Sequence, residues 1–158
     1  MPQHAIYYTT APAQADHQQA MARLFVNGPR LNIEISVPDA LAQTLTTDNR
    51  TIPQPEIGAA LLDTGASNTC IDITIAQKLG LQIVNRIKMR TPSDDDCEQD
   101  VYAAKLAFPG TTLPPLPLLN VAGAKLANQG LAALIGRDFL LGKTLHYDGH
   151  LSIVKLIW

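Results

Sequence analysis

The sequence lacks the features that mark nucleic-acid-binding and membrane-spanning proteins. Its 12 Lys and Arg residues stand against 14 Asp and Glu residues, and the formal net charge of -2 leaves no basic excess for nucleic acid. The longest uncharged apolar runs, such as IGAALL before Asp63, are far shorter than the roughly 20 residues that a membrane helix needs. We therefore expect a soluble protein with no nucleic-acid partner and no membrane insertion.

Cysteine is scarce and a secretory signal is not evident. Cys70 and Cys97 could form one bridge at most, and their spacing does not resemble a zinc-binding or redox pair. We expect both to be thiols, which favours a reducing compartment. The N-terminal stretch has neither a cationic segment nor a continuous apolar segment. The expected location is the cytoplasm.

Length and composition predict one globular domain. A chain of 158 residues that is 46% hydrophobic and 16% charged can bury one ordinary core. Residues 1–21 are rich in Ala, Gln, Thr and Pro without a clear period, and they predict an N-terminal arm, flexible or lying on the surface as a short helix. Residues 22–158 are the predicted domain.

Most of the remaining patterns indicate short strands. Alternating apolar residues over 31–37 predict a half-buried strand closed by Pro38, and IGAALL predicts a buried one. Further strands are expected at 69–71 and 131–135, and 113–121 is a Pro-interrupted segment that suits a sheet edge. Two hairpins are expected, one joining 86–90 to 100–108 and one around Asp148-Gly149.

Helix signals are fewer. Residues 73–79 carry an N-cap at Asp72 and a glycine at Gly80, and a helical turn is expected at 138–141. Residues 39–56 predict a long connection with at most one helical turn near its start. The pattern as a whole predicts an all-β fold, a closed or partly open barrel or a sandwich, with one or two short helices.

The stretch ALLDTGASNTC places one carboxylate, that of Asp63, at the end of an apolar strand. A buried Asp needs a partner, a hydrogen bond or a chemical role. Gly65 allows close backbone approach, and the Thr64 hydroxyl can bind main-chain groups and hold the loop rigid. The alternative is an Asp that simply closes a tight turn.

Amide hydrolysis by acid and base needs two groups in opposite protonation states. No second Asp-Thr-Gly or Asp-Ser-Gly occurs in the sequence, and the turn at Asp148 lacks the hydroxyl residue. A two-fold homodimer would bring two copies of Asp63 together on its axis, where two close carboxylates share one proton, as in the aspartic proteases.

LLDTGAS at 61–67, followed by ALIGRDFLL at 133–141, resembles the retropepsin-like aspartic proteases, and the helix after TCI looks more like bacterial or cellular members than viral ones. The resemblance implies an aspartic endopeptidase without cofactor or metal, acting on polypeptides as a homodimer. Asp63 would be catalytic, supported by Thr64 and Gly65, with Thr64 interlocking with the partner's loop. The second motif would thread behind the Asp loop; it comprises Leu134, Ile135, Gly136, Arg137 and Asp138.

The resemblance also implies contacts with the substrate, and the sequence differs from the family pattern at two places. Ala66 and Ser67 would lie along the peptide, but Ser67 replaces the Asp that often pairs with the Arg of the second motif in viral members. Arg137 therefore needs another partner, and a structural role at a helix start, with a local ion pair to Asp138, is favoured over direct catalysis. The hairpin tip over the site is acidic rather than glycine-rich, with Asp94, Asp95 and Asp96 as substrate-contact candidates.

Several alternatives stay open. The acidic tip is either a solvated loop or, across a dimer, a like-charged pair that favours acid pH and basic peptides. Cys70 is read as a buried thiol rather than a nucleophile, and His146 and His150 as a solvated pair rather than metal ligands. The apolar C-terminal strand would be satisfied by pairing with a partner chain. A catalytically weak or inactive binding or assembly module of the same fold is the alternative function.

Overall fold

Two β-sheets of unequal size make up most of the computed structural model, which describes residues 3–7, 17–91 and 94–158. Within these residues there are ten strands, four α-helices and one 3-10 helix, in contrast to the one or two helices predicted. The strands are β1 Gln3–Tyr7, β2 Arg30–Ser36, β3 Glu56–Leu62, β4 Cys70–Asp72, β5 Ile83–Thr91, β6 Asp94–Ala107, β7 Leu116–Ala124, β8 Ala133–Ile135, β9 Thr144–Asp148 and β10 Ile153–Ile157. The helices are α1 His17–Asn27, α2 Asp39–Thr47, α3 Ile73–Lys78, the 3-10 helix Ala127–Gln129 and α4 Arg137–Leu140.

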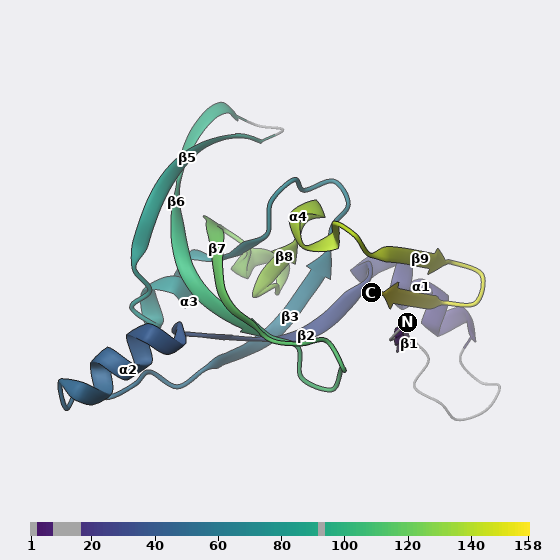
Figure 1. Ribbon diagram of the computed structural model, residues 1–158. Helices are drawn as coiled ribbons and strands as arrows, with labels where there is room; N and C mark the ends of the chain where they lie inside the picture. The colour runs from purple at the N-terminus through teal and green to yellow at the C-terminus, as the bar shows by residue number, and fades with distance from the viewer. Residues whose placement is uncertain (1–2, 8–16, 92–93) are drawn as a thin grey trace.

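The larger sheet is a partial ring. Its seven strands follow the order β2-β3-β8-β4-β7-β6-β5, and β2 also pairs with β6. The pairs β3–β8 and β4–β7 are parallel and the others are antiparallel. The predicted all-β class is confirmed. The β5–β6 hairpin rises from this ring and curves over toward the side on which β9, β10 and α1 lie (Figure 1).

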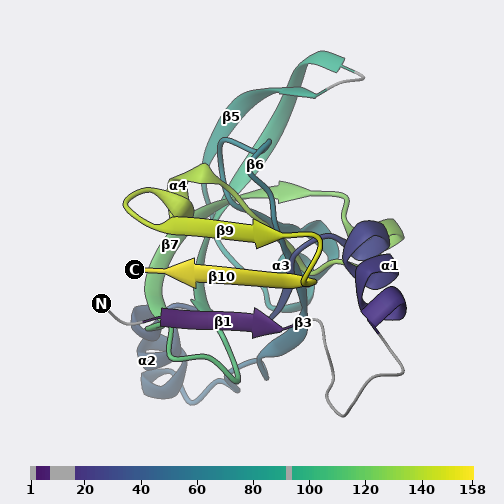
Figure 2. The ribbon, with the colours of Figure 1, turned by 90° about the vertical axis from the view of Figure 1, so that its right-hand side faces the viewer.

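The smaller sheet has the order β1-β10-β9 and contains both ends of the chain (Figure 2). The C-terminal strand β10 pairs with β1 on one side and with β9 on the other. The expectation that pairing with a partner chain would satisfy the C-terminal strand is therefore wrong, because strands of the same chain cover both of its edges. The outer edges of this sheet belong to β1 and β9.

The N-terminal region contains more regular structure than its composition suggested. Gln3–Tyr7 is a strand rather than a loose arm, and α1 runs across the boundary predicted at residue 21. The connection after β2 contains α2, a helix of nine residues rather than a single turn. Leu45 of this helix is buried, while Leu41 and Ala42 pack against the core.

The other local predictions agree with the structure. Asp72 caps α3, Gly80 follows it with φ of 61°, and both predicted hairpins form. The segment expected to suit a sheet edge, 113–121, includes the first part of β7, which pairs with β6 on one side only. Pairing of β7 with β4 begins at Ala122, so Pro117 lies where one side of the strand has no ladder partner.

A single apolar core joins the two sheets. It includes Ile33 and Ile35 of β2, Leu24 of α1, and Val154 and Leu156 of β10, all almost fully buried. Because the smaller sheet and α1 share this core with the ring, the termini are integral to the domain.

Candidate active site

Asp63 lies one residue beyond β3, at the point where this strand runs beside β8. The Asp63 N–H donates to the Ile135 carbonyl at 2.9 Å, which fixes the backbone to the neighbouring strand. One carboxylate oxygen, Oδ1, accepts a hydrogen bond from the Gly65 N–H at 2.8 Å. Asp63 is half-buried, and its Oδ2 has no hydrogen-bond partner among the described residues. The turn therefore orients the carboxylate through one oxygen and leaves the other available.

Gly136 allows the second motif to pass directly behind the Asp63 loop. Leu134 and Ile135 belong to β8, which is inserted between β3 and β4. A Cβ atom added at Gly136 would lie 2.5 Å from the carbonyl carbon of Asn68, closer than real Cβ contacts. Only glycine fits here, because the two backbones are in direct contact.

Arg137 binds the loop that follows Asp63. Its Nη1 donates to the carbonyl oxygens of Thr64 at 2.7 Å and Gly65 at 3.1 Å, and its Nη2 donates to the Ser67 hydroxyl at 2.7 Å. The Arg137 N–H also donates to the Ala66 carbonyl at 3.0 Å. The expected ion pair with Asp138 is not formed in the described structure. The partner that Arg137 needed is the loop itself, including Ser67.

Asp138 holds the far end of the loop through Thr69. Its two carboxylate oxygens accept the Thr69 N–H at 2.9 Å and the Thr69 hydroxyl at 2.8 Å. The Thr69 hydroxyl in turn accepts the Gly136 N–H at 3.1 Å. Thr69 is buried and nearly inaccessible to solvent. It was not identified from the sequence. A hydroxyl residue directly before the apolar pair Cys70-Ile71 was the available signal.

The remaining predicted site residues are placed as follows. Thr64 and Ser67 are exposed and Ala66 is half-buried. The Thr64 hydroxyl makes no hydrogen bond within the described chain, so the rigidity expected from it comes from Arg137 instead. The acidic residues 94–96 lie at the start of β6 by their backbone, and their side chains lie outside the described part.

Cys70 is a buried thiol beside this loop. Burial, together with the nearby negative charges of Asp138 and Asp63, raises its pKa to about 11. Its Sγ lies 3.5 Å from the Asn68 carbonyl oxygen. Since the reactive form of cysteine is the thiolate, this environment is that of an inert side chain, in agreement with the thiol expected.

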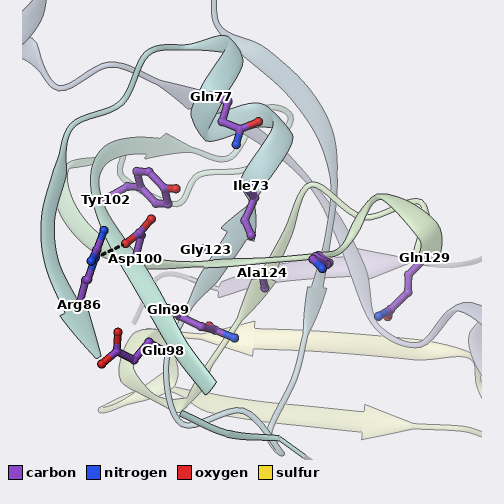
Figure 3. Close-up of a pocket in the computed structure, with 11 residues that line it drawn as sticks. Ile73, Gln77, Arg86, Glu98, Gln99, Asp100, Tyr102, Gly123, Ala124 and Gln129 are labelled. Carbon is purple, nitrogen blue, oxygen red and sulfur yellow. Dashed lines mark hydrogen bonds and ion pairs between the residues drawn. The ribbon is translucent and has the colours of Figure 1, made fainter. Parts of the chain in front are cut away.

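A polar pocket of about 790 Å³ lies between α3, the base of the β5–β6 hairpin and the end of β7 (Figure 3). Arg86 and Asp100 form an ion pair on its wall at 2.8 Å. Burial, together with the negative charge of Asp100, raises the pKa of Tyr102 in the same wall. The Gln99 Oε1 atom is buried without a hydrogen-bond partner in the described residues. The pocket thus offers a buried acceptor and a neutralised charge pair.

Two further observations concern metals and membranes. Among residues 3–7, 17–91 and 94–158, no group of three or more His, Cys, Asp and Glu side chains is arranged to hold a metal ion. His150 instead packs edge-on against His17, with ring centroids 5.7 Å apart. None of the described helices has both the length and the apolar character needed to cross a membrane.

Comparison with known families bears on this geometry. A family model described as aspartyl protease matches residues 38–139, a range that contains the Asp63 loop, the hairpin and the second motif. The chain belongs to the aspartyl protease family. The family assignment agrees with the resemblance carried by the two motifs, and the membership covers the segments that build the site.

A search of solved structures found matches as well. A retropepsin-like aspartic protease from Rickettsia conorii is 14% identical, with 98% of this chain and 90% of that chain covered and a TM-score of 0.46. The retroviral protease-like domain of Ddi1 from Leishmania major is 17% identical, with 75% and 80% covered and a TM-score of 0.38. A search of curated proteins found no match.

Proposed function

We propose that this aspartyl protease family member is a homodimeric endopeptidase whose catalytic pair is Asp63 and the partner subunit's Asp63. The observation that carries the proposal is the hydrogen bonding of the Asp63 carboxylate. Oδ1 is oriented by the Gly65 N–H and Oδ2 is without a partner in the described subunit. An oriented, half-buried carboxylate with one free oxygen is suited to share a proton with a symmetry-related copy.

The pair supplies both halves of acid and base catalysis. The ionised carboxylate takes a proton from a bound water, whose oxygen attacks the carbonyl carbon of the scissile amide. The protonated carboxylate donates to the carbonyl oxygen, so that a neutral tetrahedral intermediate forms. As this intermediate collapses, the carbon–nitrogen bond breaks, the amide nitrogen receives a proton from the pair, and one hydroxyl of the intermediate returns a proton to the pair. The products are a carboxylic acid and an amine, and no cofactor takes part.

The substrate in this proposal is a polypeptide. Ala66 would lie beside the bound backbone, the free Thr64 hydroxyl would contact the partner's loop, and Ser67 would act through Arg137. The pocket that contains Gln99 suits a polar side chain that can donate to the buried Oε1 atom. The acidic tip at 94–96 would favour basic peptides, because opposite charges attract. It would favour closure at acid pH, because the two acidic tips repel each other across the dimer axis and acid weakens this repulsion.

The proposed location is the cytoplasm. Cys70 is a free thiol in the structure, and an unpaired cysteine is the ordinary state in a reducing compartment. Fractionation of cells that express the full chain would test this, and recovery outside the cytoplasm would contradict it.

Asp63→Asn tests the catalytic assignment. The substitution keeps the size of the side chain and the acceptor for the Gly65 N–H, so fold and dimer should be retained. We expect cleavage of a peptide library, measured by mass spectrometry across pH, to be lost by at least about 10³-fold. Asp48→Asn, at an exposed position after α2, is the matched control and should cleave normally.

Two results would contradict the proposal. Retained cleavage by Asp63→Asn would show that another group carries the chemistry. A wild-type dimer that cleaves no peptide at any pH, and that is insensitive to a statine-type transition-state mimic, would instead indicate the binding or assembly module.

A further inference from the structure

Helix α1 carries an apolar surface that the described residues leave exposed. Of its side chains, Ala20 and Leu24 are buried, while Met21, Ala22, Phe25 and Val26 are exposed. Phe25 is 87% exposed and Val26 is 74% exposed. Together with Tyr147 of β9, we call Met21, Ala22, Phe25 and Val26 the α1 patch. Exposed apolar clusters of this kind usually mark an interaction site.

The α1 patch is hollowed and held in place. A pocket of about 580 Å³ lies between α1 and the β9–β10 hairpin, with Met21, Phe25 and Tyr147 in its wall. The contact between His17 and His150 fastens the start of α1 to the hairpin turn, and buried Leu24 fastens its end to the core. The surface is therefore a fixed part of the domain.

The end of α1 lies beside the strand that carries the catalytic loop. Gly28 follows the helix with φ of 66°, and a Cβ atom there would lie 2.7 Å from Leu61 Cδ1. The Leu62 N–H donates to the Pro29 carbonyl at 2.8 Å, one residue before Asp63. Val26 is thus three residues from a backbone contact with the end of β3. Figures 1 and 2 show α1 on the side toward which the β5–β6 hairpin curves.

We propose that the α1 patch packs against a second copy of this chain in the dimer. This inference rests on the proposed function, since an axis that brings two Asp63 carboxylates together passes close to the end of β3 and so close to α1. The α1 patch also contains no charged side chain, so a two-fold axis can bring two copies together without like-charge repulsion. The partner contributes Asp63 to the site, and α1 supplies apolar contact area beside it.

The test compares two variants in the full chain. Phe25→Ser combined with Val26→Ser should raise the dimer dissociation constant, measured by analytical ultracentrifugation, by at least about tenfold, because each substitution acts twice in a two-fold interface. Cleavage should fall at low protein concentration and recover at high concentration. Ile57→Ser is the matched control, since Ile57 is 71% exposed but lies at the opposite end of β3 from Asp63. It should leave the dissociation constant unchanged.

The outcomes separate this inference from the proposed function. An unchanged dissociation constant in the double variant overturns the inference, whatever the effect of the substitutions on Tm. Loss of cleavage in Asp63→Asn would then leave the catalytic assignment standing. A wild-type chain that is monomeric at every concentration overturns both the inference and the symmetric pair.

Discussion

The carboxylate of Asp72 connects three parts of the structure. Its Oδ1 accepts the Thr74 N–H at 2.9 Å and the Thr74 hydroxyl, which caps α3. Its Oδ2 accepts the N–H groups of Leu126 at 2.7 Å and Ala127 at 2.8 Å. Burial alone would raise the pKa of Asp72, but these hydrogen bonds outweigh it and hold the pKa below the model-peptide value of 3.8. The sequence predicted the cap, whereas the bonds to residues more than fifty positions away depend on the tertiary fold.

Asp72→Asn should therefore destabilise the protein in a pH-dependent way. Since the folded pKa lies below 3.8, ionised Asp72 stabilises the fold above that pH and loses this effect as the pH falls through the folded value. We expect a loss of about 2 kcal/mol in the free energy of unfolding at neutral pH, which shrinks below pH 3.8. Urea unfolding at several pH values measures it. Asp48→Asn should show no such effect, and a loss that persists in acid would refute the explanation.

At the scale of elements, α4 and the Asp63 loop form one unit. The loop carries the proposed catalytic carboxylate, while α4, only four residues long, supplies Arg137 and Asp138 to fix its two ends. A guanidinium can donate to several acceptors in a fixed fork, which a lysine ammonium cannot reproduce. The orientation of Asp63 therefore depends on a helix that begins 74 residues later, as the positions of Asp63 and Arg137 show.

Arg137→Lys tests this dependence. It keeps the positive charge and loses the simultaneous bonds to Thr64, Gly65 and Ser67. We expect kcat for peptide cleavage to fall by about 10- to 100-fold, because a small displacement of a catalytic group is costly, with KM changed much less. Arg50→Lys, at an exposed position, is the control. Equal kcat values in the two variants would mean that Arg137 does not position the loop.

The accuracy of the sequence analysis differed between elements for physical reasons. The α3 cap and both hairpins have short-range signals, and the structure confirms them. Helix α2 was missed because its three Thr residues lower helix propensity, although each Thr hydroxyl bonds the carbonyl four residues earlier. The parallel pairing of the end of β7 with β4 and the role of Thr69 arise from long-range contacts, which a single sequence does not specify.

For the molecule as a whole, the termini belong to the folded unit. β1 pairs along its full length with β10, from Gln3 opposite Ile157 to Tyr7 opposite Ile153. Side chains of β10 are buried in the core that the smaller sheet shares with the larger one. The strand β1 covers one edge of β10 and is therefore attached to the rest of the domain. Residues 1–21 were predicted to lie outside the domain because their apolar residues do not recur at a regular spacing. A strand can pair through its backbone without such a spacing.

Removing residues 1–7 should therefore do more than trim a tail. The deletion exposes one edge of β10, which is apolar and prone to pair with other chains. We expect Tm to fall by about 5 to 10 °C and soluble aggregates to appear in light scattering. A variant that lacks only residues 1 and 2 retains β1 and should behave as the full chain. An unchanged Tm in the longer deletion would show that β1 contributes nothing to stability.

The insertion of β8 between β3 and β4 also determines when the site can come into existence. The Asp63 N–H finds its acceptor at Ile135, and the loop passes over Gly136 and is tied by Arg137. During synthesis the loop therefore cannot acquire this shape before Arg137 and Asp138 have left the ribosome. Any polypeptide that ends before Gly136 therefore lacks the contacts that give the Asp63 loop its shape, so the topology makes the order of synthesis part of how the loop is built.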